Sequence, residues 1–140
     1  MKRPFVTCAS ALMLLAAGTA LAHHSPILFD RTKKVALSGT VAEFAWMTPH
    51  ASIQLDVPKP GGSVERWSVE MNSPNNLEKD GWKSTLIKTG DKVTIVVYPL
   101  TSGEHGGIFV SMKLADGRVF GDKWTEGIEA RGSLQARKRT

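Results

Sequence analysis

The first part of the chain alternates apolar and polar residues in a pattern that predicts a long, bent β-hairpin. From Val35 to Val41, small or apolar residues occupy every second position, as they do in a strand with one buried face. The alternation then slips by one residue before Phe44 and Trp46. An extra residue near Ala42 or Glu43 explains this slip, so we expect a β-bulge that bends the strand there.

A corner and a return strand complete this hairpin. Met47-Thr48-Pro49 predicts a tight corner, because proline fixes φ and favours an extended conformation in the residue before it. His50 opens the return, and apolar residues alternate with polar ones from Ala51 to Val57. Trp46 and His50 flank the corner and are therefore our candidates for a ligand-binding surface.

More strands and one short helix are predicted further along the chain. Strands are expected at residues 64–71, 92–99, 108–115 and 118–120, with a helix at residues 75–80. Ser73 is expected to cap this helix, Pro74 to occupy its first turn and Gly81 to end it. The strand at 92–99 is apolar almost throughout, which indicates that both of its faces are covered.

This order of elements predicts an all-β fold with one short helix. Five long strands with a helix between the third and the fourth follow the order of the OB fold, a small Greek-key barrel. A long, bulged first strand suits a small barrel, because that strand must bend to serve both sides. A small β-sandwich is the alternative, and periodicity alone does not separate the two.

The first 22 residues have the pattern of a secretory signal peptide. Lys2 and Arg3 precede an apolar run at residues 9–21, and Ala20-Leu21-Ala22 fits the cleavage rule for small residues. This run is shorter than the ~20 residues that a membrane-spanning helix needs. We therefore expect cleavage after Ala22, export to the periplasm, and no transmembrane segment in the mature chain.

The mature chain is expected to be a single domain at residues 23–120, followed by a poorly structured basic tail at 121–140. The whole chain has a formal net charge of +5, part of which leaves with the signal peptide. Cys8 leaves with it too, so the mature chain holds no cysteine and depends on its core for stability. Basic residues cluster at Arg137-Lys138-Arg139 without interleaved aromatic residues, which favours a solvated terminus over contact with lipid or nucleic acid.

Several short motifs run through the mature chain. They are His23–Ser25, Gly39–Val41, Phe44–Ala51, Trp67–Glu70, Ser73–Leu77, Gly81–Trp82 and Gly90–Val93. Together they resemble a family of small secreted bacterial proteins of unknown function. Thr48 departs from the family pattern, which usually has Asn before the Pro-His pair. The resemblance implies export and this fold, and it brings no assigned activity.

Four histidines are the candidates for metal chemistry. Cleavage after Ala22 would give His23 a free α-amine beside its imidazole, and both nitrogens can chelate one metal ion. A second histidine would complete a T-shaped set that resembles the histidine brace of copper proteins, and such all-nitrogen coordination favours Cu(II). His50 is the first candidate for this ligand, followed by His24 and His105. The alternative is that these histidines only bond to backbone or solvent.

The sequence contains no nucleophilic triad motif, P-loop, dinucleotide fingerprint or CxxC pair. We therefore expect a non-enzymatic periplasmic binding or accessory module. Its partner is expected to be an envelope protein or a small ligand rather than nucleic acid. A copper-binding protein that uses His23 is the alternative, and a copper oxidoreductase ranks below it.

Overall fold

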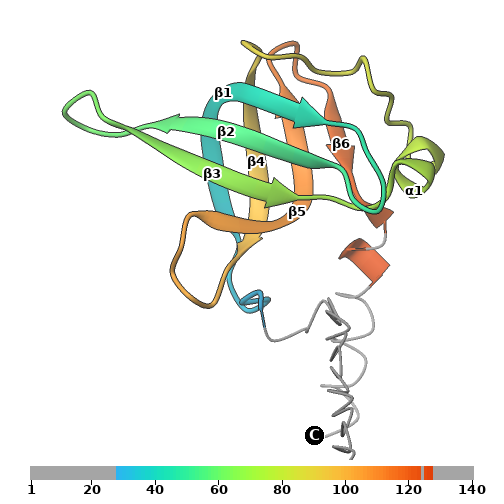
Figure 1. The fold of residues 1–140 in the computed structure, drawn as a ribbon, viewed down its shortest axis with the longest axis horizontal. Helices are drawn as coiled ribbons and strands as arrows, with labels where there is room; N and C mark the ends of the chain where they lie inside the picture. Colours follow the sequence, from blue (N-terminus) through green and yellow to red (C-terminus); the bar gives the residue numbers. More distant parts are fainter. Residues whose placement is uncertain (1–27, 124, 128–140) are drawn as a thin grey trace, which may run out of the picture.

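In the computed structural model, which describes residues 28–123 and 125–127, the strands wind into a small β-barrel (Figure 1). The elements are β1 (Val35–Ala45), β2 (Ser52–Pro58), β3 (Val64–Glu70), α1 (Pro74–Lys79), β4 (Lys92–Pro99), β5 (Gly106–Leu114) and β6 (Val119–Gly121). Each predicted element is present with ends shifted by at most two residues. The predicted signal peptide, His23, His24, Trp124 and residues 128–140 lie outside the described residues.

The strand order closes the barrel and confirms the OB fold. Antiparallel pairs join the strands in the order β3-β2-β1-β4-β5, and a parallel pairing of β3 with β5 joins the two ends. An open sandwich has no such closing pair, so the β-sandwich alternative is wrong. In Figure 1 the turn between β2 and β3 extends to one side of the barrel, and α1 lies at the opposite side.

The predicted bulge is present in β1. Residues Val35–Thr40 pair with β4, whereas Thr40–Ala45 pair with β2, and the register to β2 shifts between Val41 and Glu43. The extra residue bends β1 so that its two halves pair with strands on different sides of the barrel. A second register shift, opposite Val96 and Val97 of β4, leaves Val110 as the extra residue in β5 and bends that strand.

The barrel interior is filled by side chains from every long strand and from α1. Fully buried members include Ile53, Leu55, Val69, Leu77, Trp82, Ile95, Val97, Phe109 and Met112. Leu77 anchors α1, and Trp82 packs edge-on against Phe109 with ring centroids 5.3 Å apart. The alternation seen in the sequence identified the inward-facing residues of β2, β3 and β4. In β5 it grouped Ile108 and Val110 with Met112 and Leu114, which is wrong, because the register shift at Val110 turns Phe109 into the core and leaves Ile108 and Val110 outside.

A second, smaller apolar cluster covers the outer face of β4 and β5. It consists of Phe29, Tyr98, Ile108 and Val110. Phe29 forms a β-bridge with Leu100, and the Asp30 N–H donates a 2.8 Å hydrogen bond to the Pro99 carbonyl. The segment before β1 thus docks on the barrel, and the prediction that β4 is covered on both faces is confirmed.

The start of the predicted tail also packs against the barrel. Asp122 and Thr125 are buried, and the Thr125 hydroxyl donates a 3.1 Å hydrogen bond to the Phe109 carbonyl. The Trp82 indole N–H donates a 3.1 Å hydrogen bond to the Gly121 carbonyl. The expectation of poor structure is therefore wrong for residues 121–123 and 125–127. These contacts are mostly polar, so no hydrophobic periodicity signals them.

Gly39 occupies the tightest point of the bent strand. It follows the inward-facing Leu37 by two residues, so a side chain here would point into the barrel. A Cβ atom at this position would overlap the Asp56 carbonyl oxygen and approach Leu55 Cγ to 3.1 Å. The backbones of β1 and β2 lie close together there, and only glycine fits between them.

We expect Gly39→Ala to lower the free energy of unfolding by about 1–3 kcal/mol, because the added methyl group forces the two strands apart. Urea unfolding followed by tryptophan fluorescence measures this change. Ala36→Val is the matched control, since it adds methyl groups at an exposed position of the same strand and should change stability by less than about 0.5 kcal/mol. Equal losses in both variants would refute the close approach at Gly39.

Candidate functional site

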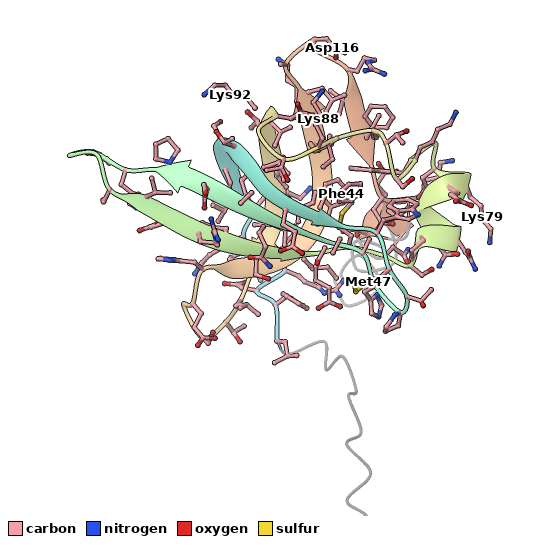
Figure 2. The ribbon with its side chains drawn as sticks, turned by 45° about the horizontal axis from the view of Figure 1, so that its top comes forward. Phe44, Met47, Lys79, Lys88, Lys92 and Asp116 are labelled. Carbon is pink, nitrogen blue, oxygen red and sulfur yellow. The ribbon has the colours of Figure 1, made fainter. Side chains whose placement is uncertain are left out.

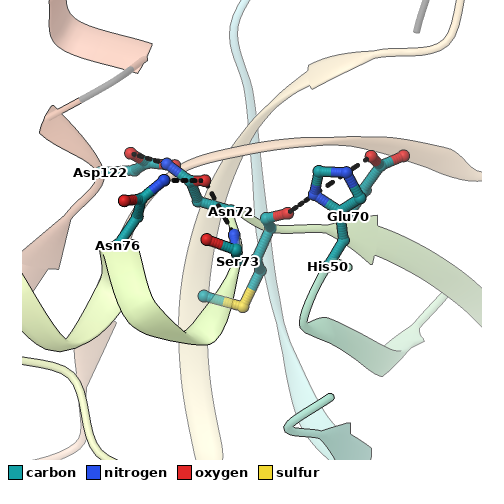
Figure 3. Close-up of polar contacts among 7 residues, drawn as sticks. His50, Glu70, Asn72, Ser73, Asn76 and Asp122 are labelled. Carbon is teal, nitrogen blue, oxygen red and sulfur yellow. Dashed lines mark hydrogen bonds and ion pairs between the residues drawn. The ribbon is translucent and has the colours of Figure 1, made fainter. Parts of the chain in front are cut away.

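His50 ties the loop between β1 and β2 to the end of β3 (Figure 3). Its Nδ1 lies 3.2 Å from the Met71 carbonyl oxygen and 4.0 Å from Glu70 Oε1. The Met71 N–H donates to the Ala51 carbonyl at 2.9 Å, so the backbone connects the same two segments. A proton on Nδ1 can be donated to the Met71 carbonyl, which makes Nε2 the nitrogen with the lone pair.

On the other side of Met71, Asn72 is the centre of a hydrogen-bond network (Figure 3). Its Oδ1 accepts from the Ser73 N–H at 2.8 Å and from Asn76 Nδ2 at 3.1 Å, and its Nδ2 donates to Asp122 Oδ1 at 3.4 Å. Ser73 occupies the predicted cap position, but its hydroxyl makes no capping bond. Asn72 instead links β3, α1 and the segment after β6.

We call the residues His50, Glu70, Asn72, Asn76 and Asp122 the β3-exit cluster. Asp122 is 1% exposed, whereas the side chains of His50 and Glu70 are about one-third exposed. The cluster therefore has an inner half at the partly buried Asn72 and the buried Asp122, which joins β3 to the segment after β6, and an accessible half at His50 and Glu70. Sequence reasoning singled out His50 but missed Asn72 and Asp122, because nothing local connects positions fifty residues apart.

His105 lies at the other end of β3. Its Nε2 is 3.5 Å from Glu65 Oε1, and its ring stacks on Trp67 with centroids 5.3 Å apart. Lys59 Nζ also contacts Glu65, at 2.9 Å. The Lys59 ammonium, aided by His105, lowers the pKa of Glu65 below its usual value. His105 is thus packed on the barrel surface.

His50 and His105 do not share a site. Their carboxylate neighbours, Glu70 and Glu65, are five positions apart on β3, which corresponds to about 16 Å and to opposite faces of the strand. Within residues 28–123 and 125–127, no three His, Cys, Asp or Glu side chains gather as a metal-binding group. His23 and His24 lie outside the described residues, so the copper-binding set stays a prediction.

Trp46 is half-buried beside the corner that holds His50. Its ring meets Phe44 edge-on with centroids 5.6 Å apart, and both rings pack against the main core. The next residue, Met47, is 59% exposed and points outward from the ribbon in Figure 2. Trp46 therefore packs between the loop and the core, and the Met47 side chain is exposed to solvent.

The outward-facing side chains of β1, β2 and β3 form a continuous polar surface, which we call the strand face. Its members are Glu43, Ala45, Ser52, Gln54, Asp56, Arg66, Ser68 and Glu70. Arg66 binds Asp56 through two hydrogen bonds of 2.8 and 2.9 Å and lowers the pKa of that carboxyl. Gln54 Nε2 donates to Ser68 Oγ at 3.1 Å.

Charge on the strand face is opposite to that of the whole chain. Three carboxylates, on Glu43, Asp56 and Glu70, face a single guanidinium on Arg66, although the chain is basic overall. In OB folds this face of the second and third strands, bordered by the loops after the first and fourth strands, is the usual binding surface. In the sequence, the strand face corresponds to the polar positions that alternate with the inward-facing residues.

These residues define the class of protein: an OB-fold barrel with a polar strand face and a polar cluster at the exit of β3. The chain belongs to the family of unknown function DUF6152, whose model matches residues 11–110. This confirms the resemblance that the motifs indicated. A search among curated proteins found no match.

Two solved structures share part of the backbone arrangement. The mitochondrial single-stranded DNA binding protein Rim1 of S. cerevisiae aligns with a TM-score of 0.45 and 12% identity, over 59% of this chain and 93% of that protein. The N-terminal domain of PriB from Thermoanaerobacter tencongensis aligns with a TM-score of 0.42 and 16% identity, over 60% of this chain and 97% of that domain. Of these two proteins, only the yeast protein is described as binding DNA.

The described residues contain no helix that is long and apolar enough to cross a membrane.

Replacing the central amide of the network tests its role. Asn72→Asp places a carboxylate oxygen beside the buried carboxylate of Asp122, so we expect a loss of about 2 kcal/mol or more in unfolding free energy at pH 7. The repulsion raises the pKa of one carboxyl of the pair, so the folded state binds a proton more tightly than the unfolded state. The loss should therefore shrink as the pH falls from 7 towards 4.

Urea unfolding of both proteins across this pH range measures the effect. Asn75→Asp is the matched control, because Asn75 is exposed in α1, three residues after Asn72, and the change should alter stability by less than about 0.5 kcal/mol at any pH. A cost in Asn72→Asp that stays constant with pH would contradict the proposed contact between the two carboxyl groups.

Proposed function

We propose that this protein is an exported periplasmic binding or accessory module without enzymatic activity, and that the strand face is its binding surface. Export is supported by the signal-peptide pattern of residues 1–22. The surface is supported by its position, since OB folds commonly bind ligands across these strands. The observation that carries the proposal is the acidic balance of the strand face on a basic chain.

The chemistry of the strand face favours one class of partner. Glu43 and Glu70 add negative charge beyond the Asp56–Arg66 pair, while Ser52, Gln54 and Ser68 offer hydrogen-bonding groups. Such a surface complements a segment of an envelope protein that carries basic or hydrogen-bond-donating side chains. Nucleic acid is disfavoured, because its phosphates would meet carboxylates on this face.

At one border of the face, Met47 supplies an exposed apolar group in the same loop as His50. Interfaces gain much of their affinity from such apolar anchors, while the surrounding polar groups set specificity. The proposed partner would therefore place an apolar side chain on Met47 and extend its basic residues across β2 and β3.

A photo-crosslinking amino acid placed at Ser52 or Ser68 should capture a discrete partner in intact cells. The double change Glu43→Lys/Glu70→Lys should abolish that product, because it reverses the charge of the surface. The product is measured by gel mobility and identified by mass spectrometry.

The matched control carries Glu78→Lys/Glu126→Lys, which makes the same charge change at exposed sites on α1 and after β6. It should leave the crosslinked product unchanged. Equal loss in both double variants, or equal crosslinking from a probe at Lys79 on α1, would argue against the strand face as the binding surface.

Copper binding by the mature terminus is a second candidate function, favoured by the geometry of His50. Metal-binding histidines usually donate their other ring N–H to a carbonyl or carboxylate, which fixes the ring and its tautomer. His50 Nδ1 lies near both kinds of acceptor, at Met71 and at Glu70. His50 Nε2 would then serve as the second ligand beside the α-amine and imidazole of His23.

A Cu(II) titration of the processed protein, with its first residue established by mass spectrometry, tests this candidate. We expect sub-micromolar binding that is lost when one residue is added before His23, because the extension removes the free α-amine at that position. His50→Ala should weaken binding by at least about tenfold, the effect of one lost ligand. His105→Ala is the control and should have no effect. Equally weak binding by the processed and extended proteins would eliminate copper binding as a function.

A further inference from the structure

A pocket of about 410 Å³ lies at the other half of β1, away from the β3-exit cluster. It is lined by residues of β1, β4 and β5, with Pro58 at the end of β2 on its border. In Figure 1 the hairpin of β2 and β3 extends beyond the barrel on one side. Its volume falls within the range of about 300–1000 Å³ that is typical of small-molecule sites.

The polar lining of this pocket is cationic and rich in hydroxyl groups. Lys92 and Lys113 supply two ammonium groups, and Ser38, Thr40 and Thr94 supply three hydroxyls. Ser38 Oγ and Thr94 Oγ1 lie 2.9 Å apart, so they form a preset pair of hydrogen-bonding groups on adjacent strands. Among residues 28–123 and 125–127, no carboxylate side chain lines this pocket.

The two lysines lie diagonally across neighbouring strands. Thr94 of β4 pairs with Lys113 of β5, and Lys92 is two positions before Thr94 on the same face. Diagonal neighbours of this kind are about 7–8 Å apart, close enough for both ammonium groups to reach one ligand. In Figure 2, Lys92 projects outward, far from Met47 and from Lys79 on α1.

Nearby carboxylates do not neutralise these lysines. Asp116 is held by Arg118, whose Nε lies 2.8 Å from Asp116 Oδ2, and Asp91 Oδ2 accepts the Lys88 N–H at 3.0 Å. Among the described residues, neither Lys92 nor Lys113 forms an ion pair. Two adjacent cations without a counter-charge repel each other, and an anion bound between them would relieve that repulsion.

We propose that this pocket binds a ligand bearing an oxyanion, either a phosphate or a carboxylate group. Lys92 and Lys113 bind the anionic oxygens through charge-assisted hydrogen bonds. Of the Ser38 and Thr94 hydroxyls, the one that accepts in their mutual hydrogen bond donates its own proton to a remaining oxygen. The rest of the ligand fills the hollow against Pro58. This site borders the strand face, since Thr40 pairs with Asp56. It uses none of that face's side chains and none of the predicted copper ligands, so its test is independent of both.

Pyrophosphate is the first probe, titrated into the ¹⁵N-labelled processed protein at low salt and followed through amide chemical shifts. Shifts should concentrate at residues 38–40, 92–94 and 113–115. Lys92→Gln/Lys113→Gln should raise the Kd by at least about tenfold, because it removes both charged donors while keeping most of each side chain. The same spectra verify that the variant remains folded.

Lys79→Gln/Lys83→Gln is the matched control, because it removes the same charge from exposed positions outside the pocket. It should leave the Kd unchanged. Equal weakening in both double variants, or shifts spread over all lysine-bearing surfaces, would overturn the proposal.

Sedimentation with vesicles distinguishes two sources of such an anion, a lipid headgroup and a soluble ligand. Binding to phosphatidylglycerol vesicles but not to phosphatidylcholine vesicles, lost in Lys92→Gln/Lys113→Gln alone, would identify a lipid headgroup. Pyrophosphate binding at the pocket without vesicle binding would identify a soluble ligand. Failure of both pyrophosphate and vesicles to bind would overturn the proposal.

Discussion

The bend in β1 is the feature on which the rest of the structure depends. One strand pairs with β4 through its first half and with β2 through its second half, and the bulge between Val41 and Glu43 lies within the second half, just past the change of partner. Without that bend, β3 would not reach β5, and the sheet would keep two open edges. Gly39 permits the close approach of β1 and β2 beside the bend.

The same bend places the candidate binding surfaces at different ends of β1. The corner after β1 brings His50 to the end of β3, where Glu70 and the Asn72 network lie. The first half of β1 carries Ser38 and Thr40 into the pocket that Lys92 and Lys113 also line. An acidic face and a cationic pocket therefore occupy different parts of one small barrel, which keeps the two sets of charges from neutralising each other.

Individual residues show how far the sequence could predict the candidate site. His50 was identifiable because it follows a proline corner. The partners of His50, a carbonyl and a carboxylate at the end of β3, were not identifiable, because they are about twenty residues away. Asp122 lay in a stretch without any periodicity, yet it is buried against Asn72.

The sequence by itself determined the strands, the bulge in β1, the inward-facing residues of β2, β3 and β4, and the order of elements, because each depends on local alternation, proline and glycine geometry. Tertiary structure alone decided barrel closure through β3 and β5, the separation of His50 from His105, and the meeting of Lys92 with Lys113. Those features depend on which strands pair and in what register. Such pairing is set by packing over the whole chain, and no local window of sequence contains it.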